Sequence, residues 1–304
     1  MEYKKHPLTY AEQADLLISR GLSADRDTLI ETLKNVNYYR LSGYLYPFRN
    51  ADDSFEEGTS LDIIWRRYRF DRQLRFLLLD AIERVEVALR TRCVYSFVHK
   101  YGAFGYLDNK YLPNLNQDQY DNFKQKLATE ISRSKETFVI HFNQKYGDKH
   151  DMPPLWIACE LFSLGLFLTF YRGIERSIQQ QLARDLGIPD VVLFSWLLAL
   201  NNLRNLCAHH GRIYNKNFKI KLPTNAKKYP TWFNPFPIAR KKLFTVLTVL
   251  KYLLSYVAPK SRWHVRLNNL IEEYNDIPQD IMGFPENWKE SVFWEDLDVD
   301  GDEA

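Results

Sequence analysis

Residues 61–100 read LDIIWRRYRFDRQLRFLLLDAIERVEVALRTRCVYSFVHK, and this stretch decides the fold class. Its apolar residues recur at intervals of three or four, which places them along one face of a helix. Gly102 follows at the point where such a helix is expected to end. The pattern predicts one long helix from about Leu61 to Lys100. Its apolar face comprises Ile64, Tyr68, Leu74, Leu78, Ile82, Val85, Leu89 and Phe97.

The other faces of this predicted helix carry charges of both signs. Charges of mixed sign, three and four residues apart, are typical of a helix face exposed to solvent. We therefore expect these side chains to be solvated. They are Arg66, Arg67, Arg69, Arg72, Arg75, Glu83, Arg84, Glu86, Arg90 and Arg92.

Before the long helix, the sequence predicts two short helices over residues 8–20 and 25–36. Thr9 and Glu12 have the spacing of a capping box at the start of the first, and residues 23–25 supply the start of the second. Gly21 separates the two helices.

Residues 38–50, YYRLSGYLYPFRN, combine four tyrosines with a glycine and a proline that interrupt regular structure. This pattern predicts a turn that packs the N-terminal hairpin onto the main domain. Contact of its basic and aromatic residues with nucleic acid is the alternative. We place the boundary of an N-terminal helical subdomain at residue 50.

After the long helix, further helical patterns extend to residue 274, so we assign residues 51–275 to one helical core. Residues 211–237 contain four prolines and predict a loop or short hairpin. Residues 276–304 form an acidic C-terminal extension that ends in DLDVDGDEA. The predicted helices span residues 117–146, either continuous or broken, and 155–172, 174–186, 191–209, 238–258 and 262–274.

The composition agrees with an all-α fold in the cytoplasm. Aromatic residues reach 15%, whereas only 12 glycines and 13 prolines occur in 304 residues, which favours large packed helices. The N-terminus has no uninterrupted apolar segment of the kind found in signal peptides. The apolar stretch 155–171 is shorter than the roughly 20 residues of a membrane span, so we expect a buried helix and no membrane association.

The three cysteines, Cys93, Cys159 and Cys207, do not have the spacing of a metal site. We expect them to be buried thiols.

Charge is distributed unevenly along the C-terminal third. Residues 191–271 contain 14 Lys and Arg and no acid, whereas residues 272–304 contain 12 acids and one lysine. A basic block of this kind indicates a polyanionic partner, most simply nucleic acid, because neutralised phosphates release counterions. A solubilising surface is the alternative interpretation.

The motif that carries chemistry is RNLCAHHGRIYN at residues 204–215. The bare spacing of an arginine and a histidine is common by chance. Here an asparagine directly follows Arg204, the pair ends an apolar helix, and the basic stretch comes next. A helix places Asn205 and His209 one turn apart with Arg204 adjacent, so the three groups can converge on one phosphate. His210 also satisfies the spacing, but we favour His209 because it lies one turn from Asn205.

These side chains suit RNA cleavage by attack of the 2′-hydroxyl on the neighbouring phosphorus. His209 would act as general acid or base, Arg204 would stabilise the developing negative charge, and Asn205 would orient the imidazole or hold a phosphate oxygen. The sequence shows no carboxylate cluster for a metal, so we expect neither a metal nor another cofactor. A second match, Arg92 to His99, is expected to be structural.

Several segments together resemble the Abi-like (abortive infection) family of bacterial phage-defence proteins, within the HEPN ribonuclease superfamily. The likeness spans residues 8–294. The segments that carry it are NVNYYRLSGYLYPFR (35–49), FEEGTSLDIIWRRYRFDRQLRFLLLDAIERVEVALRTR (55–92), PPLWIACELFSLGLF (153–167), RNLCAHHGRIYN (204–215) and GFPENWKESVFW (283–294).

The resemblance implies a HEPN-like helical bundle and a metal-independent endoribonuclease that leaves 2′,3′-cyclic phosphate ends. It maps the superfamily motif onto Arg204, Asn205 and His209. It also implies a toxin that forms a homodimer with a composite site and is restrained by a partner, such as a small RNA or another antitoxin. A catalytically inactive RNA-binding or regulatory module and a covalently modified antitoxin of HEPN type are the rival interpretations. The residues expected to bind RNA are Arg212, Tyr214, Asn215, Lys216, Lys219, Lys221, Lys227 and Lys228.

Overall fold

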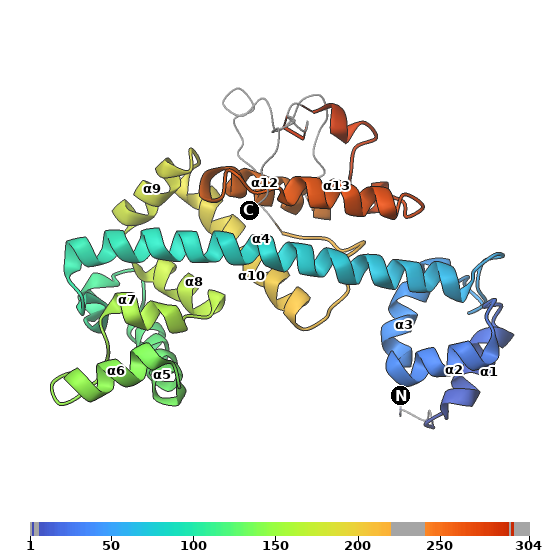
Figure 1. Cartoon of the computed structure of the whole chain (residues 1–304), viewed down its shortest axis with the longest axis horizontal. Helices are drawn as coiled ribbons and strands as arrows, with labels where there is room; N and C mark the ends of the chain where they lie inside the picture. Colours follow the sequence, from blue (N-terminus) through green and yellow to red (C-terminus); the bar gives the residue numbers. More distant parts are fainter. Residues whose placement is uncertain (1, 3–5, 220–240, 292, 295–304) are drawn as a thin grey trace. The chain divides into compact units, whose positions relative to one another are not determined.

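The computed structural model describes residues 2, 6–219, 241–291, 293 and 294, and within these residues the fold is all-α, as predicted (Figure 1). No β-strand occurs in the described ranges, which contain only two isolated β-bridges. The α-helices are α1 (Tyr10–Ser19), α2 (Arg26–Asn35), α3 (Tyr38–Leu45), α4 (Leu61–Tyr101), α5 (Gln117–Arg133), α6 (Thr137–Tyr146), α7 (Leu155–Ala158), α8 (Leu164–Gly173), α9 (Arg176–Asp185), α10 (Asp190–Ala208), α12 (Leu243–Val257) and α13 (Trp263–Glu273). The short 3₁₀ helices are η1 (Tyr46–Phe48), η2 (Gly105–Leu107), η3 (Asn109–Tyr111), η4 (Cys159–Leu161), η5 (Asp280–Met282) and η6 (Trp288–Glu290).

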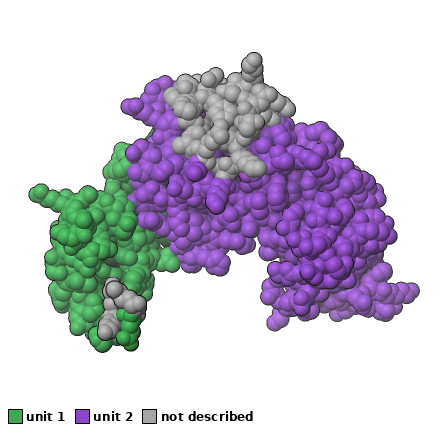
Figure 2. All heavy atoms as spheres, turned by 180° about the vertical axis from the view of Figure 1, so that it is seen from behind, with its two compact units in different colours: residues 1–76, 266–278 green, residues 77–265, 279–304 purple. Residues whose placement is uncertain are grey.

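The chain forms two compact units, shown in green and purple in Figure 2. Unit 1 comprises residues 1–76 and 266–278, and unit 2 comprises residues 77–265 and 279–304. The sequence places a boundary at residue 50, whereas unit 1 extends through the first part of α4. Contacts within unit 1 account for this extension, since Tyr274 packs on Phe70 of α4 with ring centroids 5.5 Å apart.

In unit 1, the first two helices begin where the sequence predicts. Thr9 accepts a hydrogen bond from the backbone N–H of Glu12, whose carboxylate accepts one from the backbone N–H of Thr9 at 2.7 Å. This is the predicted capping box. Asp25 caps α2 by accepting from the backbone N–H of Thr28 at 2.8 Å.

The segment 38–50, predicted to be a turn, is largely helical, so that prediction is wrong. Asn37 caps α3 by accepting a hydrogen bond from the backbone N–H of Tyr39, and η1 follows α3 directly. Leu41, Tyr44 and Leu45 are buried on one side of α3, and this burial outweighs the low helix propensity of Gly43. The buried residues of this segment therefore lie on a helix and not in a turn.

Part of the charged face of α4 is buried, in contrast to the solvated face that the sequence predicts. Arg67, Asp71, Arg75 and Arg90 are all buried. In unit 1, the carboxylate of Asp71 accepts hydrogen bonds from the hydroxyl of Tyr44, at 2.7 Å, and from the guanidinium of Arg75 one turn later. Burial raises the pKa of Tyr44, and the Asp71 carboxylate raises it further.

Unit 2 is organised around α10, which packs against α8, α9 and α12. Trp196 of α10 is fully buried and meets the ring of Tyr252 of α12 edge to face at 5.7 Å. In the part of the chain that the structure describes, α10 is also the one helix with the length and apolar composition of a membrane span. The core helix of a globular protein passes the same test, and these packing contacts identify α10 as such a helix.

The apolar stretch 155–172 is not the single helix that the sequence predicts. It forms α7, η4 and α8, with Phe162 and Ser163 in extended conformations between η4 and α8. Ser163 caps α8 by accepting a hydrogen bond from the backbone N–H of Leu166 at 3.2 Å. The longer stretch 117–146 breaks between α5 and α6, as the sequence allows.

All three cysteines are free and buried in unit 2, as predicted. Burial raises the pKa of the Cys159 thiol to about 12. Burial also raises the pKa of Cys93, well above the ordinary range of a thiol.

The described part of the C-terminal extension is aromatic as well as acidic. Phe284, Trp288 and Trp294 pack around the ring of Phe244 on α12, with centroids between 4.7 and 5.9 Å from it. The ammonium group of Lys251 lies 4.9 Å from the Trp294 ring centroid. These residues therefore belong to the core of unit 2, whereas the predicted acidic tail at residues 295–304 lies outside the described residues.

Replacing Asp71 with alanine should destabilise the protein by about 3–5 kcal/mol, because the buried guanidinium of Arg75 loses its carboxylate. Asp15→Ala is the matched control. It removes an exposed pair with Arg26 and should cost less than about 1 kcal/mol. Urea unfolding followed by circular dichroism measures both losses. Equal losses in the two variants would contradict the importance of the buried network.

Candidate functional site

The C-terminal end of α10 holds the predicted motif in a defined turn (Figure 1). The backbone N–H of His210 donates to the carbonyl of Cys207 at 3.0 Å, and that of Gly211 donates to the carbonyl of Leu206 at 2.7 Å. His210 has φ +58°, in the left-handed region. These are the features of a Schellman motif, in which glycine usually occupies the left-handed position. Here a histidine occupies it.

Gly211, the residue after His210, packs closely against the last turn of α10. A Cβ atom at Gly211 would lie 2.3 Å from the Cδ1 atom and 3.1 Å from the carbonyl oxygen of Leu206. A side chain at this position would therefore displace the side chain of Leu206 and crowd its backbone oxygen. The turn therefore fixes the direction in which the chain leaves the motif.

The structure brings Arg204 and Asn205 together, as predicted. The Nη1 atom of Arg204 lies 3.4 Å from the Oδ1 atom of Asn205. His209 is the C-cap, and its backbone N–H donates to the carbonyl of Asn205 at 2.9 Å, so it remains one turn away. Arg204 is half-buried, whereas Asn205 and His209 are exposed. The three side chains therefore start from one exposed end of α10.

Glu86 on α4 is a member of the site that the sequence did not identify. Burial raises the pKa of its carboxyl, and the cationic side chains of Arg90 and Arg204 lower it in part. Such a half-buried carboxylate, close to the motif arginine, is typical of a functional site. The sequence contains one sign of this interaction, because Glu86 and Arg90 lie one turn apart on α4. The charge pattern instead predicts that both residues lie on a solvated helix face.

Arg90 links this carboxylate to the break before α8. Its Nη1 atom lies 3.6 Å from a carboxylate oxygen of Glu86 and donates to the backbone carbonyl of Phe162 at 3.3 Å. Its Nη2 atom lies 3.5 Å from Glu160. The buried guanidinium is thus paired with carboxylates from two segments.

Asn201 lies one turn before Asn205 on α10. Its side chain is close to the start of α8. Its Oδ1 atom is buried and accepts no hydrogen bond from the described residues. A Cβ atom at Gly165 of α8 would lie 3.9 Å from this oxygen. Unsatisfied buried acceptors are uncommon, and this one marks a polar position between α10 and the start of α8.

The segment after the motif divides into buried and exposed residues. Ile213 and Tyr214 are buried, with Tyr214 only 1% exposed, and the guanidinium of Arg212 lies 5.8 Å from the Tyr214 ring centroid. A ring so enclosed offers no face on which an RNA base could stack, so Tyr214 does not suit the predicted role in RNA binding. Asn215 has φ +57° and is exposed.

The predicted lysine cluster is only partly described. Lys216 is half-buried and Lys219 is exposed. Lys221, Lys227 and Lys228 lie outside the described residues.

The apolar residues beside the motif complete the core of the single chain. Leu203 and Ile213 are fully buried, so neither is available to a dimer surface, whereas Leu206 is half-buried. The exposed face of α10 instead carries Val191 and Leu198, which are 54% and 43% exposed. Asn205 follows Leu198 by seven residues, which is about two helical turns, so it lies on the same exposed face of α10.

The model of the Abi-like protein family matches residues 31–215, more than half of the chain. The chain belongs to the Abi-like protein family. Membership of this family suggests a role in abortive infection. The match includes Glu86 and Arg90 and ends at Asn215, so it contains the whole motif. Neither the comparison with curated proteins nor that with solved structures finds a match.

The second arginine and histidine match of this Abi-like protein does not form a comparable site. Arg92 Nη2 donates to the carbonyl of Tyr256 at 3.5 Å, whereas the Nδ1 atom of His99 lies 2.8 Å from the carbonyl of Tyr95 on its own helix. Among the described residues, no group of three or more His, Cys, Asp or Glu side chains is arranged to hold a metal ion.

Replacing Arg204 with alanine should raise the pKa of Glu86, because the cationic guanidinium favours the ionised carboxylate. His209→Ala should leave this pKa unaltered. Titration of the glutamate carboxyl carbons by nuclear magnetic resonance measures both values. An unchanged pKa in Arg204→Ala would separate Glu86 from the motif.

Proposed function

We propose that this Abi-like protein is a metal-independent endoribonuclease of the HEPN superfamily that acts as a toxin in abortive infection. The observation that carries the proposal is the end of α10. There Arg204 and Asn205 lie side by side, and His209 follows one turn later on the exposed surface. A guanidinium, an amide and an imidazole so placed suit a phosphodiester, which needs charge stabilisation and proton transfer.

The reaction is an internal transesterification. An imidazole of His209 takes the proton of the 2′-hydroxyl, the bond between O2′ and phosphorus forms, and the bond between phosphorus and O5′ breaks. The leaving oxygen takes a proton from a second imidazole. The products carry a 2′,3′-cyclic phosphate and a 5′-hydroxyl, so no water or metal enters the balance. Arg204 faces the developing phosphorane, and Asn205 holds an oxygen or orients His209.

Glu86 and Arg90 are positioning residues in this proposal. Since the carboxylate of Glu86 interacts with both arginines, it restrains the half-buried Arg204 before RNA arrives. A preorganised cation is worth more to catalysis than a mobile one, because it needs no reorganisation during the reaction.

RNA is proposed to approach along the basic segment that follows the motif. The described residues available for phosphates are Arg212, Asn215, Lys216 and Lys219. A partner that restrains the toxin, such as a small RNA or another antitoxin, also belongs to the proposal, as does action in the bacterial cytoplasm.

Replacing Arg204 or His209 with alanine should reduce RNA cleavage by about 10²-fold or more, since a general acid or base typically supplies 10²- to 10⁴-fold. His210→Gly is the matched control. Glycine suits the left-handed backbone at this position, so this variant should fold and keep its activity if His209 is catalytic. Cleavage of labelled RNA in EDTA provides the measurement.

Three results would contradict this assignment. Full activity in His209→Ala together with loss in His210→Gly would transfer the catalytic role to His210. Cleavage by the wild-type chain that is abolished by EDTA would indicate a metal-dependent nuclease. RNA binding without cleavage under all conditions would indicate an inactive RNA-binding module.

The active unit should be a homodimer, because one motif supplies a single imidazole and the reaction uses two. An isologous contact brings the same surface from each chain together. The exposed face of α10, with Val191 and Leu198, can provide this contact and bring the two His209 residues to one phosphate. Leu198→Glu should therefore abolish dimerisation and cleavage together. Ile140→Glu on α6 is the control, since Ile140 is equally exposed at 43%.

Sedimentation of the wild-type chain at micromolar concentration should show about twice 36.1 kDa. A sharper test mixes wild-type chains with an excess of His209→Ala chains under exchange conditions. Activity per wild-type chain should fall as mixed dimers form. Constant activity at every ratio would mean that each chain carries a complete site.

A further inference from the structure

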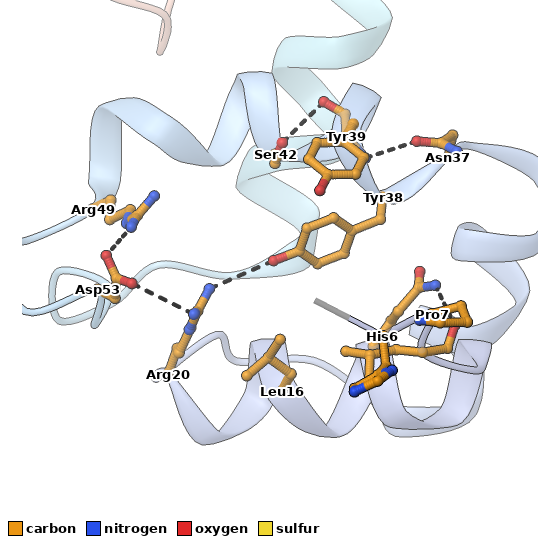
Figure 3. Close-up of a pocket in the computed structure, with 12 residues that line it drawn as sticks. His6, Pro7, Leu16, Arg20, Asn37, Tyr38, Tyr39, Ser42, Arg49 and Asp53 are labelled. Carbon is orange, nitrogen blue, oxygen red and sulfur yellow. Dashed lines mark hydrogen bonds and ion pairs between the residues drawn. The ribbon is translucent and has the colours of Figure 1, made fainter. Parts of the chain in front are cut away.

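Unit 1 contains an open pocket of about 890 Å³ between α1, α3 and the segment 49–53 (Figure 3). All of its lining residues lie within residues 6–53. Its volume falls in the range of pockets that bind small molecules, which is roughly 300 to 1,000 Å³. The pocket shares no residue with the motif on α10.

One end of the pocket is cationic. The carboxylate of Asp53 lies between the guanidinium groups of Arg20 and Arg49, as Figure 3 shows. One carboxylate cannot neutralise two guanidinium groups, so this end keeps an excess positive charge. Arg20 is held loosely, since its contacts with Asp53 and with the hydroxyl of Tyr38 are both 3.5 Å long. Guanidinium groups in this situation have N–H donors left for an anion with several oxygens, such as a phosphate.

The backbone holds this cationic end in place. The N–H of Phe55 donates to the carbonyl of Arg20 at 2.7 Å, which attaches the segment 49–55 to the end of α1. Within that segment, the N–H of Asn50 donates to the carbonyl of Ser54 at 2.9 Å. An anion that binds here therefore meets charges on a preformed frame, which lowers the entropic cost of binding.

The other end of the pocket is aromatic. The rings of Tyr38 and Tyr39 meet edge to face at 5.6 Å, and Figure 3 shows the Tyr38 hydroxyl directed toward Arg20. Tyr39 is 71% exposed although it stands in the first turn of α3, where the Asn37 cap fixes its backbone. An exposed tyrosine ring beside a second ring provides a surface on which a base can stack.

We propose that this pocket binds a nucleotide, with the base against Tyr38 and Tyr39 and the phosphate at Arg20 and Arg49. A purely apolar ligand would remove the guanidinium groups from water without replacing their hydrogen bonds, at a large cost. The nucleotide is either free in solution or a single residue of an RNA strand. The proposal is independent of the ribonuclease proposal, because the motif and the pocket lie in different units.

Binding is tested by isothermal titration of the full chain with adenosine 5′-monophosphate, adenosine, a 2′-O-methyl oligoadenylate and a polyglutamate peptide. None of these probes can be cleaved by attack of a 2′-hydroxyl. Tyr39→Ala removes the proposed stacking surface, and Tyr39→Phe keeps it. Tyr46→Ala is the matched control, since Tyr46 is 70% exposed in the same unit and does not line the pocket.

The expected result is that the monophosphate or the oligomer binds and that Tyr39→Ala weakens binding about tenfold, by loss of stacking. Tyr39→Phe and Tyr46→Ala should bind as the wild type does. Binding of the monophosphate identifies a free nucleotide, and binding of the oligomer alone identifies a strand. The proposal is overturned if neither binds, if Tyr39→Ala and Tyr46→Ala have equal effects, or if only polyglutamate binds.

Discussion

A buried guanidinium has to be neutralised and hydrogen-bonded, and Arg90 imposes this requirement on unit 2. Its partners are Glu86 on its own helix, Glu160 in η4 and the backbone carbonyl of Phe162 at the break before α8. Arg90 donates a hydrogen bond to this carbonyl at the break. The same side chain thus links the break before α8 to the Glu86 carboxylate, whose pKa is lowered in part by Arg204. Local chain geometry and the electrostatics of the candidate site therefore depend on one residue.

The end of α10 shows how backbone chemistry can position reactive side chains. The Schellman turn packs Gly211 closely against Leu206 and places His210 in the left-handed region. His209 consequently remains in register with Asn205, while the chain turns away directly after it. A motif that looks like a loose spacing of residues in the sequence is a rigid geometric unit in the fold.

The elements that the sequence predicted well are those in which local pattern and tertiary packing agree. The capping box of α1 and the apolar face of α4 are examples. The helix α3 was missed because burial of Tyr44 and its neighbours outweighs a glycine and a proline, and burial depends on distant residues. The division of residues 155–172 was missed for the same reason, since Arg90 lies on another helix. In the candidate site, Arg204, Asn205 and His209 follow from local spacing, whereas Glu86 joins them only through the packing of α4.

The three buried cysteines have a practical consequence. A thiol reacts with maleimides and oxidants as the thiolate, and burial keeps Cys93 and Cys159 protonated at neutral pH, while Cys207 is enclosed by the core. The native protein should therefore remain unlabelled by such reagents while it is folded. A single cysteine introduced on an exposed helix face would then carry a spin label or fluorophore without removal of the native ones. Distances between labelled copies in solution can therefore be measured without first replacing the native cysteines.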